Sequence, residues 1–400
     1  MFRIQGEYTT AKIFTDNIEE GALSQVYDIC NHIAFKNSKI RIMPDVHKGA
    51  GICIGFTAEL KDKIIPNVVG VDIGCGVLAV NLGKIDINLE KLDKFIRKNI
   101  PSGFDGYGSP EFKLNGYEKD ICNIIGLNKD KQASKLGTLG GGNHFIEIDN
   151  DKNNNKYLLI HTGSRNFGYK IAKYWQNKAI EVFENKRNKK RKKLIERLKG
   201  QNRHQEIEEK LKEFKNRNKV SKQLRYLEGN NQSNYLLNME VAQSYAKANR
   251  KYISEKILNY LDLSINEVSY IDTIHNYIGG DDIIRKGAVS AKKSEKLVIP
   301  LNMKDGAIIA KGKGNLDWNY SAPHGAGRVM SRTEAKNKLD INEFQNDMKN
   351  IYSKSLNKNT LDESPRAYKD TDIILDNTKE TIEVIERLKP IYNFKDGGEQ

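Results

Sequence analysis

Short runs rich in valine and isoleucine alternate along the chain with glycine loops and with longer segments of helical periodicity. We expect strands in the valine- and isoleucine-rich runs, because β-branched side chains pack well on a pleated surface. The predicted strands are 39–43, 51–56, 77–82, 157–160, 296–299 and 307–310, and the predicted helices are 19–36, 89–98, 168–183, 234–261 and 372–388. These elements interleave without a regular β–α–β period, which favours an α+β fold over a doubly wound sheet.

A further helical pattern lies in a strongly charged stretch. Apolar residues recur there at helical spacing on either side of the turn-like segment Gly200-Gln201-Asn202, which predicts two amphipathic helices joined by a turn. We interpret residues 184–232 as a basic helical hairpin inserted into one domain of residues 1–400. The apolar positions are Leu194, Leu198, Ile207, Leu211 and Phe214.

The positive charge of the chain is concentrated in this hairpin. Residues 186–225 hold 17 Lys or Arg and 5 Glu, so that +12 of the total net charge of +14 lies there. One interpretation is a solvated charged face. The other is contact with a phosphate backbone, which needs Lys and Arg without sequence readout and would involve Lys190, Arg191 and Lys192.

The composition of the chain is typical of a globular protein. The 400 residues, 38% of them apolar, can form a packed core. No apolar run approaches the roughly 20 residues of a membrane span, and the start of the chain lacks the apolar segment of a signal peptide. The four cysteines have no paired spacing, which is typical of reduced thiols. We therefore expect a globular cytoplasmic protein that does not enter a membrane.

Five side chains able to bind metal lie in glycine-dense segments instead of on amphipathic helices. Taken singly each is weak evidence, since a buried histidine is more often hydrogen-bonded core than a ligand. Together they favour a metal site, because thiolate and imidazole suit Zn, Mn, Fe or Co and a carboxylate suits Mn or Mg. One thiolate bridging two ions would make a two-metal clamp on a phosphoryl group. The five candidates are Asp72, Cys75, His144, His161 and His275.

Another histidine, His324, lies between small residues in the segment Ser321–Arg332. Small neighbours leave its ring accessible to a bulky substrate, and Arg328 and Arg332 supply planar donors for phosphate oxygens. Two interpretations are open: a nucleophilic imidazole, or a glycine turn in which the histidine only forms a hydrogen bond.

Six segments of the chain resemble the signature blocks of the RtcB family of tRNA-splicing and RNA-repair ligases, and they occur in the family order. They are Met43-Pro-Asp-Val-His47, Val69-Gly-Val-Asp-Ile-Gly-Cys-Gly76, Gly137-Thr-Leu-Gly-Gly-Gly-Asn-His-Phe-Ile-Glu147, His161-Thr-Gly-Ser-Arg165, Arg285-Lys-Gly-Ala-Val-Ser-Ala291 and His324-Gly-Ala-Gly-Arg-Val-Met-Ser-Arg332.

The resemblance implies a GTP- and Mn²⁺-dependent ligase that joins an RNA 2′,3′-cyclic phosphate or 3′-phosphate end to a 5′-hydroxyl end. It implies that Cys75 bridges two Mn²⁺ ions, with the other four donors completing their shells. His324 would attack the α-phosphate of GTP, and the GMP would pass to the RNA 3′-phosphate before the 5′-hydroxyl displaces it. The resemblance leaves open whether an archease-like activator is a partner.

The resemblance also implies the nucleotide contacts. Asn143 and Asn276 would hold phosphate and ribose oxygens, Phe145 and Tyr368 would flank the guanine, and Glu147 and Lys395 would bind its edge; for the two aromatic residues, core packing is the alternative. Further expected nucleotide contacts are Pro300, Leu301, Asn302, Met303, Gly325, Ala326 and Gly327, and the expected phosphate or RNA contacts are Arg165, Arg328 and Arg332.

Two features depart from the family pattern. Leu301 and Asn302 stand where the family commonly has two small residues, and the chain continues past Lys395 to Gln400 where family members usually end. The altered loop leaves a second interpretation open: an RNA-end-binding protein of the same fold with lost or altered nucleotidyl transfer.

Overall fold

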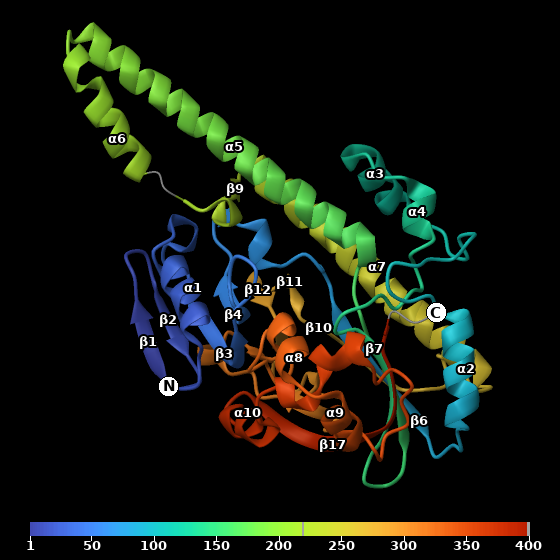
Figure 1. Cartoon of the computed structure of the whole chain (residues 1–400). Coiled ribbons are helices and arrows are strands. Elements are labelled where there is room, and N and C mark those ends of the chain that lie inside the picture. Colours follow the sequence, from blue (N-terminus) through green and yellow to red (C-terminus); the bar gives the residue numbers. More distant parts are fainter. Residues whose placement is uncertain (218–219, 398–400) are drawn as a thin grey trace.

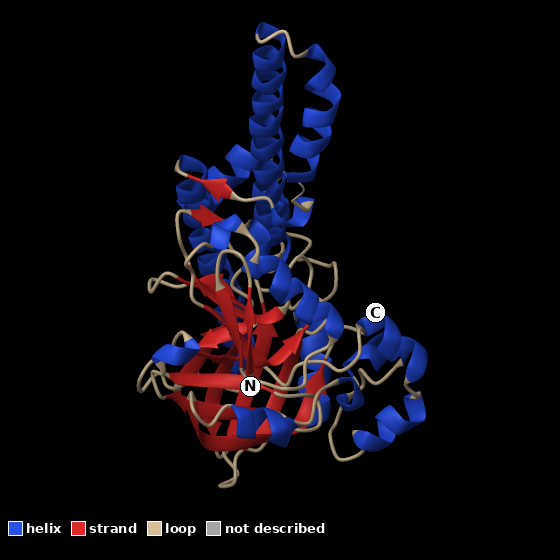
Figure 2. Ribbon diagram, turned by 90° about the vertical axis from the view of Figure 1, so that its left-hand side faces the viewer, coloured by secondary structure: helices blue, strands red, loops and turns tan. Residues whose placement is uncertain are grey.

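The computed structural model describes residues 1–217 and 220–397, and the side chains of all of these except 216 and 217. Two β-sheets, one mixed and one antiparallel, form its centre, and helices cover their outer sides (Figures 1 and 2). The α+β class predicted from the sequence is confirmed. Within the described residues, no helix combines the length and the apolar character that crossing a membrane requires.

The first sheet has six strands in the order β1-β2-β3-β4-β12-β11, and all neighbouring pairs are antiparallel except β2 and β3. Its strands are β1 (Phe2–Gln5), β2 (Thr10–Ile13), β3 (Ile40–His47), β4 (Ile54–Glu59), β11 (Asn276–Ile278) and β12 (Ile283–Lys286).

The second sheet has seven antiparallel strands in the order β10-β6-β8-β7-β17-β15-β14. Its strands are β6 (Gly76–Gly83), β7 (Phe145–Asn150), β8 (Lys156–Thr162), β10 (Tyr270–Ile274), β14 (Lys296–Pro300), β15 (Ala307–Gly312) and β17 (Ile382–Phe394). Two further pairs are β13 (Ala288–Ser290) with β16 (Ser321–Pro323), and β5 (Lys63–Ile64) with β9 (Leu227–Glu228).

Two long helices, α5 (Arg165–Gly200) and α7 (Asn230–Tyr260), pack against each other across the two sheets. Buried residues of α7 belong to both large hydrophobic clusters, one with the first sheet and one with the second. The helix thereby joins the two halves of the core. The remaining α-helices are α1 (Glu20–Cys30), α2 (Leu89–Asn99), α3 (Gly116–Ile125), α4 (Lys129–Ala133), α6 (Ile207–Arg217), α8 (Arg332–Lys338), α9 (Ile341–Asp347) and α10 (Thr371–Asn377).

One expected helix is wrong. Residues 372–388 were predicted to be helical throughout, but α10 ends at Asn377 and β17 begins at Ile382. The strand pairs with both β15 and β7, so it lies inside the second sheet. Ladder hydrogen bonds on both sides of β17 outweigh the helical spacing of its apolar residues. The tail from Phe394, which carries no fold signal in sequence, is buried as far as Lys395.

Candidate active site

The five predicted metal donors come together at one edge of the second sheet. Cys75 directly precedes β6, His144 directly precedes β7, His161 lies near the end of β8, and His275 directly follows β10. These four strands are consecutive neighbours in the sheet, and Asp72 lies in the loop that leads into β6. Strand register therefore gathers side chains that are up to about two hundred positions apart in sequence.

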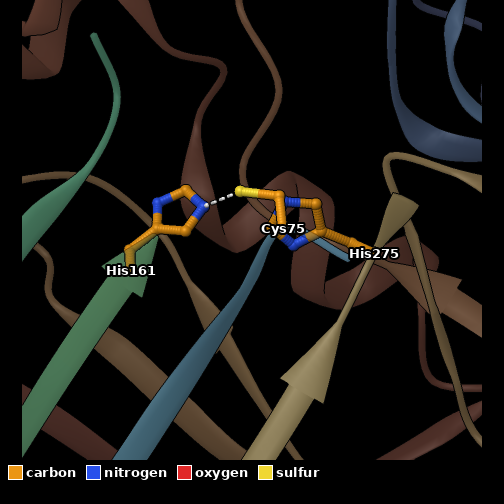
Figure 3. Close-up of side chains that lie close together, drawn as sticks. All are labelled: Cys75, His161 and His275. Atoms are coloured by element: carbon orange, nitrogen blue, oxygen red, sulfur yellow. Dashed lines mark hydrogen bonds between the residues drawn. The ribbon is translucent and has the colours of Figure 1, made fainter. Parts of the chain in front are cut away.

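Cys75 lies at the centre of the cluster. Its Sγ atom is 3.4 Å from Nε2 of His161 and 3.5 Å from Nε2 of His144. Figure 3 shows the thiol pointing towards the His161 ring, with the His275 ring beside it. Cys75 belongs to two groups whose ligand atoms all lie within 4.8 Å of one another, one with His161 and His275 and the other with Asp72 and His144. One shared sulfur with two sets of donors matches the predicted bridge.

Backbone carbonyls fix the orientation of two of the imidazoles. Nδ1 of His144 lies 3.0 Å from the Leu139 carbonyl oxygen, and Nδ1 of His161 lies 3.1 Å from that of Asn143. A carbonyl only accepts, so each Nδ1 carries the hydrogen and each Nε2 presents a lone pair to the cluster.

The electrostatics of the cluster favour bound cations. Burial lowers the pKa of His161 and His275 well below the usual range, so both imidazoles are neutral donors. Burial would raise the pKa of Asp72, but the neighbouring His144 ring and the charge of Arg165 lower it to about 2. Burial and the Asp72 charge raise the pKa of the Cys75 thiol well above normal. These electron-pair donors point at one another, and this arrangement fits two divalent ions between them.

Residues outside the donor set keep the loops that carry the donors in position. Arg250 of α7 is fully buried and donates to the carbonyl oxygens of Gly74 and Thr162, next to two of the ligands. Gly163 is required because a Cβ atom there would lie 2.2 Å from Oδ1 of Asp72. Arg165, for which a phosphate or RNA contact stays a prediction, lies beside His144 and donates to the Gly103 carbonyl oxygen.

A cavity of about 270 Å³ opens over the metal cluster. Four of the five donors line it, together with His324 and the two arginines that follow it, Arg328 and Arg332. All predicted nucleotide contacts lie in the same wall, although they come from six separate parts of the chain: Asn143, Phe145, Glu147, Asn276, Pro300, Leu301, Asn302, Met303, Gly325, Ala326, Gly327, Tyr368 and Lys395.

His324 is oriented by a carboxylate that the sequence analysis did not single out. Its Nδ1 lies 2.6 Å from Oδ2 of Asp45, and its backbone N–H donates to the same oxygen at 3.1 Å. Asp45 is fully buried in β3. The bond leaves Nε2 as the nitrogen available for chemistry, and the ring centre is 4.9 Å from that of His275. The only sequence signal for Asp45 is its place in the Met43–His47 block.

Glu363 is a second residue that the sequence analysis missed. Its Oε2 accepts hydrogen bonds from Lys395 Nζ at 2.8 Å and from the Tyr368 hydroxyl at 2.9 Å. Its Oε1 accepts from Arg332 at 2.7 Å. Burial would raise the pKa of Glu363, but the charges of Lys395 and Arg332 lower it to about 2. This carboxylate therefore positions three cavity side chains at once.

Glu147 lies deeper in the wall, beside a second carboxyl group. Its Oε2 accepts a hydrogen bond from Asn393 at 2.5 Å. Burial raises the pKa of Glu147 to about 7 and raises that of the neighbouring Asp149 well above its usual range. Although the nearby Lys395 charge opposes this rise, two adjacent buried carboxyl groups favour a shared proton over two charges.

The loop that departs from the family pattern closes on itself. Leu301 N–H donates to the Gly306 carbonyl oxygen, and the Asn302 side chain accepts from the backbone N–H groups of Lys304 and Asp305. The Leu301 side chain belongs to a buried cluster of the second sheet. The loop thus forms a well-bonded part of the cavity wall with larger side chains than the family pattern has.

The comparisons agree with this site. A family model described as tRNA-splicing ligase RtcB matches residues 25–127 and 124–396. The RNA-splicing ligase RtcB of Escherichia coli (strain K12) is 30% identical over 398 residues, which cover 89% of this chain and 90% of that protein. The tRNA-splicing ligase RtcB of Methanococcus maripaludis is 27% identical over 465 residues, covering 94% and 91%.

Proposed function

Because the chain belongs to the tRNA-splicing ligase RtcB family, and is therefore an RNA ligase, we propose that it joins RNA ends through a histidine-linked GMP. The substrates are a 2′,3′-cyclic phosphate or 3′-phosphate end and a 5′-hydroxyl end, and GTP supplies the guanylyl group. The observation that carries the proposal is the convergence of His324 and the metal donors at a single cavity.

The proposed metal donors are Cys75 as the shared ligand, with His161 and His275 on one side and Asp72 and His144 on the other. Two Mn²⁺ ions held there would neutralise phosphoryl oxygens during transfer. Mn²⁺ suits this mixture of sulfur, nitrogen and oxygen donors.

In the first step, Nε2 of His324 attacks the α-phosphorus of GTP, forming a P–N bond while pyrophosphate leaves with the electron pair of the broken P–O bond. Asp45 accepts the Nδ1 hydrogen bond at 2.6 Å, which fixes the tautomer and stabilises the positive charge that the ring gains. A neutral imidazole can attack without first losing a proton.

The guanosine would lie between Phe145 and Tyr368, with its polar edge towards Glu147 and Lys395. Lys395 is held 5.5 Å from the centre of the Phe145 ring and bonded to Glu363, so this end of the cavity is preorganised. Asn143 and Asn276 would contact the phosphate and ribose oxygens near the metal donors.

In the next step an oxygen of the RNA 3′-phosphate attacks the guanylyl phosphorus, and His324 leaves. The 5′-hydroxyl oxygen then attacks the activated 3′-phosphate, forms the new phosphodiester and releases GMP. A cyclic phosphate end is hydrolysed to the 3′-phosphate before it enters this sequence.

A ligation assay tests the proposal. Purified protein, GTP and Mn²⁺ should join an RNA with a 3′-phosphate to an RNA with a 5′-hydroxyl, and omission of GTP should abolish the product. The alternative, an RNA-end-binding protein without nucleotidyl transfer, is motivated by Leu301 and Asn302 in the altered loop. It predicts retention of the RNA end with no joined product.

A further inference from the structure

Helix α5 connects the active site to a distant part of the molecule. It begins at Arg165, beside His144, and continues without interruption to Gly200. Its first half packs on α7 and contributes buried residues up to Ala179. Its second half extends beyond the sheets and packs with the returning α6, as Figures 1 and 2 show, while Lys186 near its start pairs with Glu228 of β9. A rigid arm therefore projects from the metal site.

The two sides of this arm differ in chemistry. One side packs towards α6: Arg191 and Asn188 line a hollow together with Leu211 and Phe214, and Leu198 is buried. At about 100° per residue, Lys189, Lys193, Arg197 and Lys190 fall within an arc of roughly 100° that is turned away from this hollow. All four side chains are exposed. We call these four residues the α5 stripe.

The charges on α5 and α6 are also arranged differently. On α6, Lys212 pairs with Glu208 and Lys210 with Glu213. Among the described residues, no carboxylate lies within ion-pair distance of any member of the α5 stripe. Four of the unpaired cations of α5 thus form one solvent-facing stripe, while the exposed Lys192 and Lys199 lie outside it.

We propose that the α5 stripe binds the phosphate backbone of the RNA at a distance from the broken end. The inference rests on the proposed function only in taking RNA as the ligand. Four unpaired cations at one-turn spacing give a row of phosphate contacts without any base readout. Arg191, predicted from sequence as an RNA contact, is outside this row because it faces α6.

Helix α5 fixes the distance between the active site, which holds the RNA end, and the α5 stripe. Lys189 and Arg197 lie 24 and 32 residues beyond Arg165, or about 36 and 48 Å along a helix that rises about 1.5 Å per residue. At about 3.4 Å per stacked nucleotide, this span corresponds to roughly 10–14 nucleotides. The substrate class is thus an RNA whose stacked body continues for about one helical turn or more from the end to be joined.

A polyanion suits the stripe better than a protein or a membrane does. Protein interfaces need an apolar centre, and interfacial membrane helices need a broad apolar face. Leu198, the buried apolar side chain of this part of α5, falls on the same side of the helix as Arg191 and Asn188, so the stripe itself offers only cations.

The test replaces the four stripe residues with glutamine, as Lys189→Gln, Lys190→Gln, Lys193→Gln and Arg197→Gln. A matched control removes the same charge from exposed lysines elsewhere, as Lys84→Gln, Lys91→Gln, Lys98→Gln and Lys119→Gln. Binding to 3′-phosphate RNAs of about 6 and about 24 nucleotides, the longer one a stem, is measured by anisotropy over a salt series. Circular dichroism checks that both variants are folded.

We expect the stripe variant to lose at least about tenfold in affinity for the long RNA, and its salt slope to fall by about 3, since each of the four lost phosphate contacts removes roughly 0.7–0.9. The affinity of the stripe variant for the short RNA should equal that of wild type. The control variant should bind both RNAs as wild type does. Parallel salt slopes on the long RNA would overturn the proposal, and so would an equal loss on the short RNA. If the wild-type protein binds the long RNA through the stripe but never forms a GMP adduct, the ligase mechanism is refuted and the stripe proposal stands.

Discussion

The Asp45 carboxylate and the His324 imidazole are 279 residues apart in sequence and 2.6 Å apart in the structure. The bond links β3 of the first sheet to the segment that follows β16. It is reinforced by a close backbone contact, because a Cβ atom at Gly327 would lie 2.4 Å from the Asp45 carbonyl oxygen. Glycine at that position, with φ +74°, lets the His324 loop reach the carboxylate.

Asp45→Asn should slow guanylylation of the protein by about 10²–10⁴-fold, because an amide can hold the wrong tautomer and cannot balance the charge on the ring. Metal content should stay at the wild-type level, since Asp45 contacts none of the five donors. Single-turnover formation of the GMP adduct is the measurement. Asp120→Asn, an exposed carboxylate on α3, is the control, and an unchanged rate in Asp45→Asn would contradict the assigned orientation of His324.

Cys75→Ala should weaken both metal ions together, by at least about tenfold each, because its sulfur is common to both donor sets. Guanylylation and ligation should fail with it. Metal stoichiometry by inductively coupled plasma mass spectrometry measures the effect. Cys30→Ala removes a buried thiol outside the cluster and should retain the metal. A Cys75→Ala protein with normal stoichiometry would rule out the bridge.

The raised pKa of Glu147 predicts that the stability of the folded protein depends on pH. Its folded-state pKa of about 7 exceeds the ordinary 4.5, so the folded protein retains a proton that the unfolded chain has released. The free energy of unfolding should therefore fall as the pH rises from about 4.5 to about 7. Glu147→Gln should remove part of this fall, which is on the order of 3 kcal/mol for a shift of this size.

Thermal unfolding of the nucleotide-free protein at pH 5 and pH 8 measures this effect. The exposed Glu267→Gln should behave as wild type does. Identical pH dependence in wild type and Glu147→Gln would show that the Glu147 carboxyl is not the buried acid we infer.

The candidate donors, which the structure brings together, could be singled out in sequence because each lies in a short glycine-rich segment, and backbone freedom of that kind is a local signal. Asp45 and Glu363 were not, since their importance comes from partners that only the tertiary structure supplies. The same applies to Arg165, whose place beside His144 the motif did not indicate.

Local patterns also limited the prediction of the fold. Strands 77–82 and 157–160 were recognisable because buried central strands have continuous apolar runs. Strand β17 was not, because the outer residues Glu383, Val384 and Ile385 are exposed and break the alternation. The pattern of α5 indicated a helix but could not show how far it extends from the core.

The most direct test of the central claim is the intact mass of the protein after incubation with GTP and Mn²⁺. We expect the mass to increase by one guanylyl group, peptide mapping to locate it on His324, and His324→Ala to remain unmodified while binding metal normally. A His324→Ala protein that still becomes guanylylated, or a metal-loaded wild type that never does, would contradict the proposed nucleophile and mechanism.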